Sequence, residues 1–239
     1  CCYCLRNRVC SQMIAFAQNG ISAGVAGVDR REPPDDACPV FFLPSRINID
    51  TIARMGTPHR KNFNDPGHAH ELTFTCYRGF PFLARERTRR WLADAIDEAR
   101  FEWHFDLWAY VVMPEHVHLV VHPRETEYDI AAIRKAIKAP VGSAAIDWLK
   151  TNAPEWLPRI TRKRGGETER LFWQSGGGHD RNIIEPATLM RMIDYVHANP
   201  VRKGFVERAS EWEWSSAAFL LTGGDSPIRV DRVPPGWVP

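Results

Sequence analysis

The stretch Trp108-Ala-Tyr-Val-Val-Met-Pro-Glu-His-Val-His-Leu-Val-Val-His122 decides the centre of the fold. Two apolar runs flank a short turn at Pro114-Glu115, a pattern that predicts two antiparallel strands over about 103–113 and 116–122. Side chains alternate across a strand, so His116 and His118 share one face. Two imidazoles on one face can bind one divalent cation. A strand histidine by itself is more often structural, so further ligands must come from elsewhere in the chain.

The composition is that of an ordinary globular protein, with 239 residues, of which 44% are hydrophobic and 25% charged. A net charge of +2, from 31 basic and 29 acidic residues, gives no overall basic signature, so any nucleic-acid contact must come from local patches. Five of the six cysteines lie within the first 38 residues, which indicates neither a disulfide framework nor a zinc ribbon. We expect a reduced cytosolic compartment and no membrane-spanning segment.

Three regions follow from the pattern along the chain. Residues 1–54 show no sustained period, and we expect residues 1–60 to be a disordered or non-core extension. Met55 precedes a polar run and is a candidate for the native start of translation. Residues 61–222 are expected to form the catalytic domain, and the Pro/Gly-rich residues 223–239 to form a tail.

Within the expected domain, β-branched and aromatic residues predict a first strand over 71–77. Apolar residues at helical spacing predict helices over about 82–101, 128–151 and 187–198. Residues 154–178 are typical of a loop, with a possible short strand at Leu171–Gln174. The run Gly176-Gly-Gly178 predicts a sharp bend or a close backbone approach. A short packed helix is expected over about 212–219.

Tyr195 and Asn199 are four residues apart, which places them about one turn apart on one side of the last long helix. Asn199 could offer a carbonyl oxygen to a cation beside the Tyr195 phenol. Taken alone, the pair is better explained as a packed aromatic residue and a helix C-cap.

Three motifs that occur in order along the chain favour the functional interpretation of Tyr195 and Asn199 instead. They are Tyr110-Val-Val-Met-Pro-Glu-His-Val-His-Leu-Val120, Phe172-Trp-Gln174 and Asp194-Tyr-Val-His-Ala-Asn-Pro-Val-Arg-Lys-Gly204. Together they resemble the HUH single-tyrosine transposases, most closely the REP-associated tyrosine transposase branch, in which HUH stands for His, a hydrophobic residue and His. The resemblance implies an α+β fold with a ferredoxin-like antiparallel sheet, helices packed on it, and the histidines on a central strand. It also implies an enzyme that cuts and rejoins single-stranded DNA near hairpins.

The resemblance further implies that Tyr195 is the nucleophile and that His116, His118 and Asn199 bind Mg²⁺ or Mn²⁺. A phenol with a pKa of about 10 is a weak nucleophile at neutral pH, so a cation would have to polarise the phosphate. Attack would leave a 5′-phosphotyrosine and a free 3′-hydroxyl. Because the bond energy is retained, a 3′-hydroxyl could reverse the step without ATP.

The expected partner is single-stranded or hairpin DNA, bound by a monomer or homodimer in the bacterial cytoplasm at the nucleoid. Basic and aromatic side chains that could contact this DNA are Arg87, Arg90, Arg162, Lys163, Arg164, Trp173, Arg181, Arg202 and Lys203. Any single arginine among them is better explained as a solvated surface charge.

Two other functions compete with this one. A nucleotide hydrolase of the histidine-triad kind needs three alternating histidines, but the third position here is Val120. A domesticated protein that recognises hairpin DNA without cleaving it would need neither the histidines nor Tyr195. The complete set of these residues favours the enzyme.

Overall fold

The computed structural model describes residues 64–238. The expectations for residues 1–60, for a start at Met55 and for the five N-terminal cysteines fall outside the described residues. Among residues 64–238, no helix is long and apolar enough to cross a membrane.

The centre of the fold is a four-stranded antiparallel sheet with the order β2-β3-β1-β6. Its strands are β1 (Ala69–Thr75), β2 (Phe105–Val112), β3 (His116–Pro123) and β6 (His179–Ile183). Helix α1 (Glu86–Trp103) connects β1 to β2, and α2 (Ile130–Asn152) follows β3. This order and these crossovers confirm the predicted ferredoxin-like α+β fold. The histidine pair lies on β3, an inner strand of the sheet.

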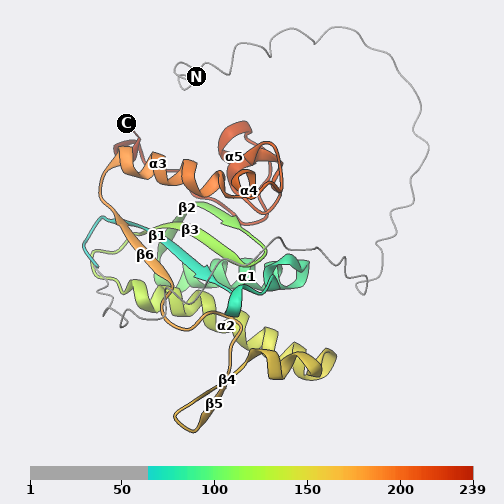
Figure 1. The fold of residues 1–239 in the computed structure, drawn as a ribbon. Helices are drawn as coiled ribbons and strands as arrows, with labels where there is room; N and C mark the ends of the chain where they lie inside the picture. Colours follow the sequence, from blue (N-terminus) through green and yellow to red (C-terminus); the bar gives the residue numbers. More distant parts are fainter. Residues whose placement is uncertain (1–63, 239) are drawn as a thin grey trace, which may run out of the picture. The chain divides into compact units, whose positions relative to one another are not determined.

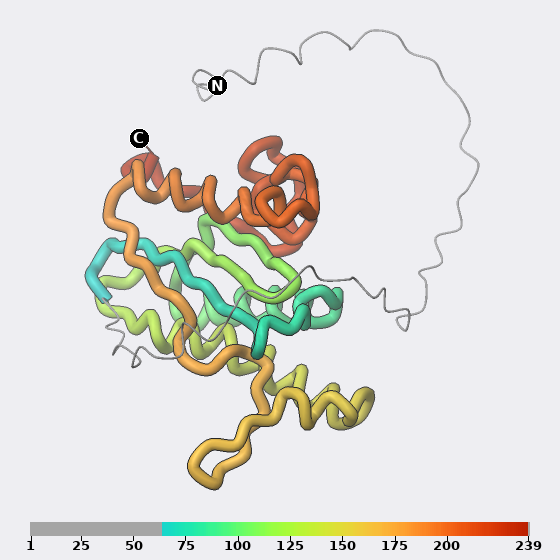
Figure 2. The backbone as a smooth tube through the Cα atoms, in the orientation of Figure 1, coloured from blue at the N-terminus to red at the C-terminus, as the bar shows by residue number. Residues whose placement is uncertain are grey.

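Each face of the sheet is covered by different helices (Figure 2). Leu72, Phe74 and Leu119 pack on the side of α1 and α2. Trp108 and Val120 belong to a second core, which includes buried residues of α3 (Pro186–His197). Because side chains alternate along β3, His116 and His118 point to the α3 side together with Val120. The strand therefore carries core residues on one face and the candidate site on the other.

The predicted loop over residues 154–178 is partly regular structure. A 3₁₀ helix (Pro154–Ile160) precedes a hairpin of β4 (Thr161–Arg164) and β5 (Glu167–Arg170), which projects from the rest of the domain (Figure 1). Both residues of its turn, Gly165 and Gly166, have positive φ angles. Charged residues fill the hairpin, so no apolar alternation indicated strands. Leu171–Gln174 forms an isolated bridge between Trp173 and Cys76 instead of the expected strand.

Strand β6 was also absent from the prediction, because its residues are mostly polar and it lies at the sheet edge. The path of the chain just before β6 explains the run Gly176-Gly-Gly178. A Cβ on Gly178 would lie 2.2 Å from the carbonyl oxygen of Thr73, and the φ of Gly178 is +78°. Only glycine fits there without a shift of the backbone, which confirms the predicted close approach.

The C-terminal residues pack against the domain and do not form a separate tail. After α4 (Asn199–Arg202) and α5 (Ala217–Thr222), Ile228 and Val230 are buried in the core beside the sheet. Arg100 of α1 forms a 2.5 Å ion pair with Asp231. The packed structure therefore continues beyond the expected boundary at residue 222. The Pro/Gly-rich composition of residues 223–239 indicated a turn-rich tail, but the few apolar residues of this segment complete the core.

Candidate active site

The two histidines of β3 lie side by side, with ring centroids 4.9 Å apart and planes nearly perpendicular. His118 is buried, and its Nδ1 lies 2.7 Å from Oε1 of Glu71. His116 is partly buried, with Nδ1 3.3 Å from Oε1 of Glu115. In both rings the carboxylate faces Nδ1, an arrangement that leaves Nε2 for a cation and fixes the ring orientation.

Glu71 was missed by sequence reasoning. It lies on β1 opposite Val120, is only 3% exposed, and accepts a 2.6 Å hydrogen bond from the hydroxyl of Thr73. A buried carboxylate is costly unless it is hydrogen-bonded, and here Thr73 and His118 both contact it. The one sequence signal was an acidic residue within an apolar strand. Its partner, 47 positions away, depends on the register of β1 and β3.

Tyr195 lies on α3, and its ring centroid is 6.0 Å from that of His118. Leu189, Ile193 and Val196 bury the other side of the helix in the second core. Tyr195 is therefore left at the helix edge, 48% exposed. The structure thus brings the tyrosine and the two histidines together on one side of the sheet.

Asn199 is buried directly after α3. Its Nδ2 donates hydrogen bonds to the carbonyl oxygens of Tyr195, at 3.2 Å, and of Val196, at 3.1 Å. Because both partners are acceptors, the amide nitrogen must face them, which leaves Oδ1 as the group for another partner. Asn199 is thus a cap of α3 in this structure, as its residue type alone favoured, and a ligand role would use Oδ1.

His197 anchors the same helix to the sheet and was also missed. Its Nε2 lies 2.8 Å from the hydroxyl of Ser216, which in turn accepts a 2.9 Å hydrogen bond from the backbone N–H of Tyr110. Burial lowers the pKa of His197 to about 4, so the imidazole is neutral at physiological pH. Ser216 ends the run Trp214-Ser215-Ser216, so this run holds α3 against β2.

One cationic side chain lies over the Tyr195 ring, and two more lie beside the carboxylates that contact the histidines or face them across the strands. The guanidinium carbon of Arg202 lies 4.1 Å from the centroid of the Tyr195 ring. Nζ of Lys203 lies 3.7 Å from Oε1 of Glu115. A hydrogen bond with His116 lowers the pKa of Glu115, so that carboxyl is ionised. Arg181 pairs in register with Glu71, which places its side chain on the same face.

The other residues predicted to contact DNA lie away from Tyr195. Arg162, Lys163 and Arg164 belong to β4. Arg87 and Arg90 lie on α1, on the opposite face of the sheet. The guanidinium carbon of Arg87 lies 3.7 Å from the centroid of the Trp148 ring, and Nη2 of Arg90 lies 3.0 Å from Oε1 of Glu86.

Trp173 differs from the expectation that it offers a stacking platform. Its ring is only 6% exposed, and its indole N–H donates to the carbonyl oxygen of Lys138. The contact of the ring with the core leaves little aromatic surface for a base.

The donor set suits a hard divalent cation only in part. Within residues 64–238, no group of three or more His, Cys, Asp or Glu side chains could hold a metal ion. His116 and His118 supply two nitrogens, and the amide oxygen of Asn199 is of the ligand type that Mg²⁺ and Mn²⁺ accept. Such a set is compatible with an open site that substrate oxygens complete.

The chain is similar to proteins of known family. No family model matches the chain. A Haemophilus influenzae protein named as a REP-associated tyrosine transposase is 28% identical over 153 residues, which cover 57% of this chain and 77% of that protein. An Escherichia coli REP-associated tyrosine transposase is 27% identical, over 57% of this chain and 69% of its own length.

A solved structure shares the fold. It is a REP-associated tyrosine transposase bound to a REP hairpin, with a TM-score of 0.55 and 20% identity, and the match covers 74% of this chain and 99% of that one.

Proposed function

We propose that this chain, which belongs to the family of REP-associated tyrosine transposases, cleaves and rejoins single-stranded DNA beside a hairpin through a 5′-phosphotyrosine. The observation that carries the proposal is the placement of Tyr195 beside His118, 6.0 Å between ring centroids, under the Arg202 guanidinium. The relative solved with a REP hairpin supports hairpin DNA as the substrate class.

The chain's own residues would act on one phosphodiester. The Tyr195 oxygen attacks phosphorus and the bond to the 3′-oxygen breaks. The phenol proton passes to solvent, since the side chain is half exposed, and the leaving 3′-oxygen takes up a proton from solvent to become the 3′-hydroxyl. Arg202 offsets negative charge on the tyrosine oxygen and then on the phosphotyrosine. Reversal by an incoming 3′-hydroxyl restores a phosphodiester and frees Tyr195.

His116, His118 and the Oδ1 of Asn199 would hold the cation, with Glu71 and Thr73 fixing the His118 ring. When bound, Mg²⁺ or Mn²⁺ would polarise the phosphate and offset charge in the transition state. Asn199→Ala tests the third ligand, because removal of Oδ1 should weaken Mn²⁺ binding. An unchanged Mn²⁺ requirement would exclude Asn199 from the site.

The decisive experiment incubates the protein with hairpin DNA carrying single-stranded flanks and Mn²⁺, and detects a covalent adduct on a denaturing gel. We expect an adduct with the wild type that is lost in Tyr195→Phe and kept in Tyr128→Phe, a tyrosine that packs against the core on the opposite face of the sheet. Hairpin binding by the wild type without any adduct would support the alternative of a binding protein that does not cleave.

A further inference from the structure

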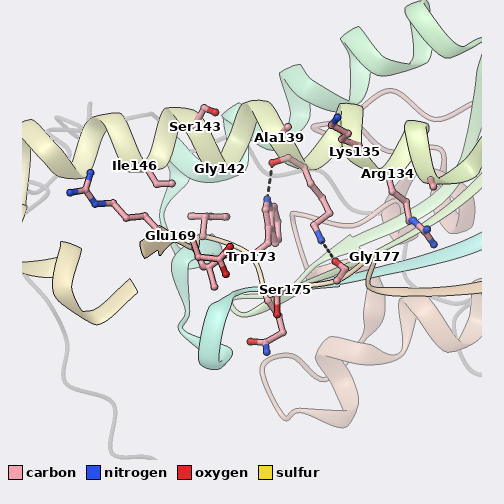
Figure 3. Close-up of a pocket in the computed structure, with 17 residues that line it drawn as sticks. Arg134, Lys135, Ala139, Gly142, Ser143, Ile146, Glu169, Trp173, Ser175 and Gly177 are labelled. Atoms are coloured by element: carbon pink, nitrogen blue, oxygen red, sulfur yellow. Dashed lines mark hydrogen bonds between the residues drawn. The ribbon is translucent and has the colours of Figure 1, made fainter. Parts of the chain in front are cut away.

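A pocket that the proposed reaction does not use lies on the face of the sheet opposite Tyr195. A cavity of about 600 Å³ opens between α2 and the segment 169–177 (Figure 3). Helix α2 contributes one wall, and the chain that leads from β5 toward β6 contributes the other. The volume is within the range of about 300–1,000 Å³ that is typical of small-molecule pockets. Lys138 of α2 belongs to the lining.

Two hydrogen bonds fix Lys138 at this pocket. Its carbonyl oxygen accepts a 2.9 Å hydrogen bond from the indole N–H of Trp173. Its Nζ donates a 3.0 Å hydrogen bond to the carbonyl oxygen of Gly176 (Figure 3). Nζ also lies 5.6 Å from the centroid of the Phe74 ring, which is buried on β1. The amine of Lys138 is therefore held between the helix and the glycine segment, beside apolar side chains.

No carboxylate balances the charge of Lys138. Within residues 64–238 this lysine forms no ion pair, and its hydrogen-bond partner is a neutral carbonyl group. The single acidic residue of the lining, Glu169, is already paired with Arg162. An ammonium at this position therefore lacks the compensation that a partly buried charge requires.

Arg134 adds a second cation beside this amine. It precedes Lys138 by about one helical turn, and a Cβ on Gly177 would lie 3.1 Å from Nη2 of Arg134, so the glycine segment covers both side chains. Nη1 of Arg134 lies 3.3 Å from Oδ2 of Asp180. The same carboxylate also lies 2.9 Å from Nδ1 of His70, so Asp180 is shared between two basic side chains.

These surroundings favour the neutral form of the amine. Burial, followed by the positive charge of Arg134, lowers the pKa of Lys138 from 10.5 to about 8. The Phe74 ring acts in the opposite direction, but its distance of 5.6 Å is close to the limit of about 6 Å for an effective cation–π contact. A neutral amine still donates to Gly176 and gains a free lone pair. A desolvated lysine beside another cation is a recurrent nucleophile in enzymes.

The rest of the lining suits an acyl donor that carries an anionic group. Lys135 and Arg170 are exposed lining residues, and neither forms an ion pair in the part of the chain that the structure describes. Ile146 and Leu171 add apolar side chains to the same lining. A ligand with a phosphate at one end and an acyl group at the other therefore finds a cationic and an apolar surface beside Lys138.

We propose that Lys138 is a nucleophilic lysine that takes an acyl group from an acyl phosphate bound in this pocket. The Lys138 nitrogen attacks the carbonyl carbon, the bond from this carbon to the phosphate oxygen breaks, and inorganic phosphate leaves with the electron pair. The nitrogen releases one proton to solvent. The product is an amide, so the modification removes a positive charge from the pocket but keeps one N–H for the carbonyl oxygen of Gly176. This inference does not rest on the proposed function.

The first test treats the wild-type full chain with acetyl phosphate and measures the initial acetylation rate of each lysine by peptide mass spectrometry. At about pH 7.5, roughly a quarter of Lys138 is neutral, against roughly 0.1% of an ordinary lysine. A less basic amine is also a weaker nucleophile, so we expect an advantage of about tenfold over Lys150. Lys150 is the matched control, because it lies on the same helix, outside the pocket, and pairs with Asp147 at 2.7 Å. Equal rates at Lys138 and Lys150 would overturn the proposal.

The pH dependence of the same rates provides a second readout. The rate at Lys138 should level off above about pH 8, because the amine is then largely neutral, whereas the rate at an ordinary ammonium rises beyond about pH 9.5. A rate at Lys138 that rises as steeply as the rate at Lys150 up to this pH would contradict an activated amine.

The third test separates the amine from the site for the phosphate. Arg170→Gln should lower the acetylation rate of Lys138 several-fold with acetyl phosphate, and should leave the rate unchanged with the uncharged N-hydroxysuccinimide ester of acetic acid. The rate at Lys150 should change with neither reagent. Arg170 is exposed at the end of β5, so loss of folding is not expected. Equal Lys138 rates for wild type and Arg170→Gln with acetyl phosphate would overturn the anionic donor, and equal rates at Lys138 and Lys150 with the ester would overturn the activated amine.

Discussion

Replacement of Glu71 by Gln is the sharpest test of how this site holds a cation. The carboxylate is 3% exposed and lies 2.7 Å from Nδ1 of His118, which is 7% exposed. A hydrogen bond to a charged group contributes about 1.5–3 kcal/mol, and loss of an outer partner of a metal-binding histidine typically weakens metal binding about 10–100-fold. At about 1.4 kcal/mol per tenfold change, the two ranges agree. We therefore expect Glu71→Gln to weaken Mn²⁺ binding at least tenfold.

The fold should tolerate this change. Gln has the shape of Glu, and its carbonyl oxygen can still accept the 2.6 Å hydrogen bond from Thr73. The replacement also removes a buried charge, so stability should change by no more than about 1 kcal/mol. Thermal unfolding of the metal-free protein measures this change and separates an effect on the site from loss of the fold.

The assay is calorimetric titration of the purified full chain with Mn²⁺ in the absence of DNA. The matched control is Glu125→Gln, since Glu125 lies 3.3 Å from Nδ1 of His104 in an exposed pair remote from Tyr195. Equal Mn²⁺ affinity for wild type, Glu71→Gln and Glu125→Gln would refute the argument that Glu71 positions His118.

Three further predictions use other parts of the structure. The pKa of His197 is about 4 in the folded protein, against 6.5 for the free side chain, so the unfolded chain binds the proton first as the pH falls. The contribution of the neutral His197 to the free energy of unfolding is therefore complete above about pH 6.5 and is lost as the pH falls toward 4. Urea unfolding should show the stability advantage of wild type over His197→Gln shrinking by up to about 3 kcal/mol between pH 7 and pH 4, and a pH-independent difference would contradict the assignment. Arg202→Ala should slow adduct formation while Mn²⁺ affinity in calorimetry is unchanged; equal adduct rates would show that the cation over the Tyr195 ring has no role in the chemistry. Gly178→Ala should destabilise the protein by more than about 2 kcal/mol in denaturant unfolding, against about 1 kcal/mol for Gly176→Ala, because only the former places a Cβ against backbone. Similar losses for the two glycine variants would contradict the close approach to Thr73.

Local pattern was sufficient for the elements with a strong apolar period. The strands around Pro114-Glu115 and the three long helices were predicted within a few residues, because each buries a continuous apolar face. The β4–β5 hairpin and the edge strand β6 have no such face. Their regularity comes from backbone pairing and turn glycines, which leave no hydrophobic signal in the sequence.

The residues of the candidate site also fall into those that the local sequence pattern predicted and those that it did not. Alternation along one strand was enough to place His116 and His118 on a common face, and helical spacing was enough to relate Tyr195 to Asn199. Glu71 and His197 became visible only in three dimensions, because their partners are 47 and 19 positions away. Strand register and the packing of α3 on the sheet create those contacts. Periodicity along the chain reports which side of an element is buried, whereas the residue that faces it across the core is decided by the tertiary structure.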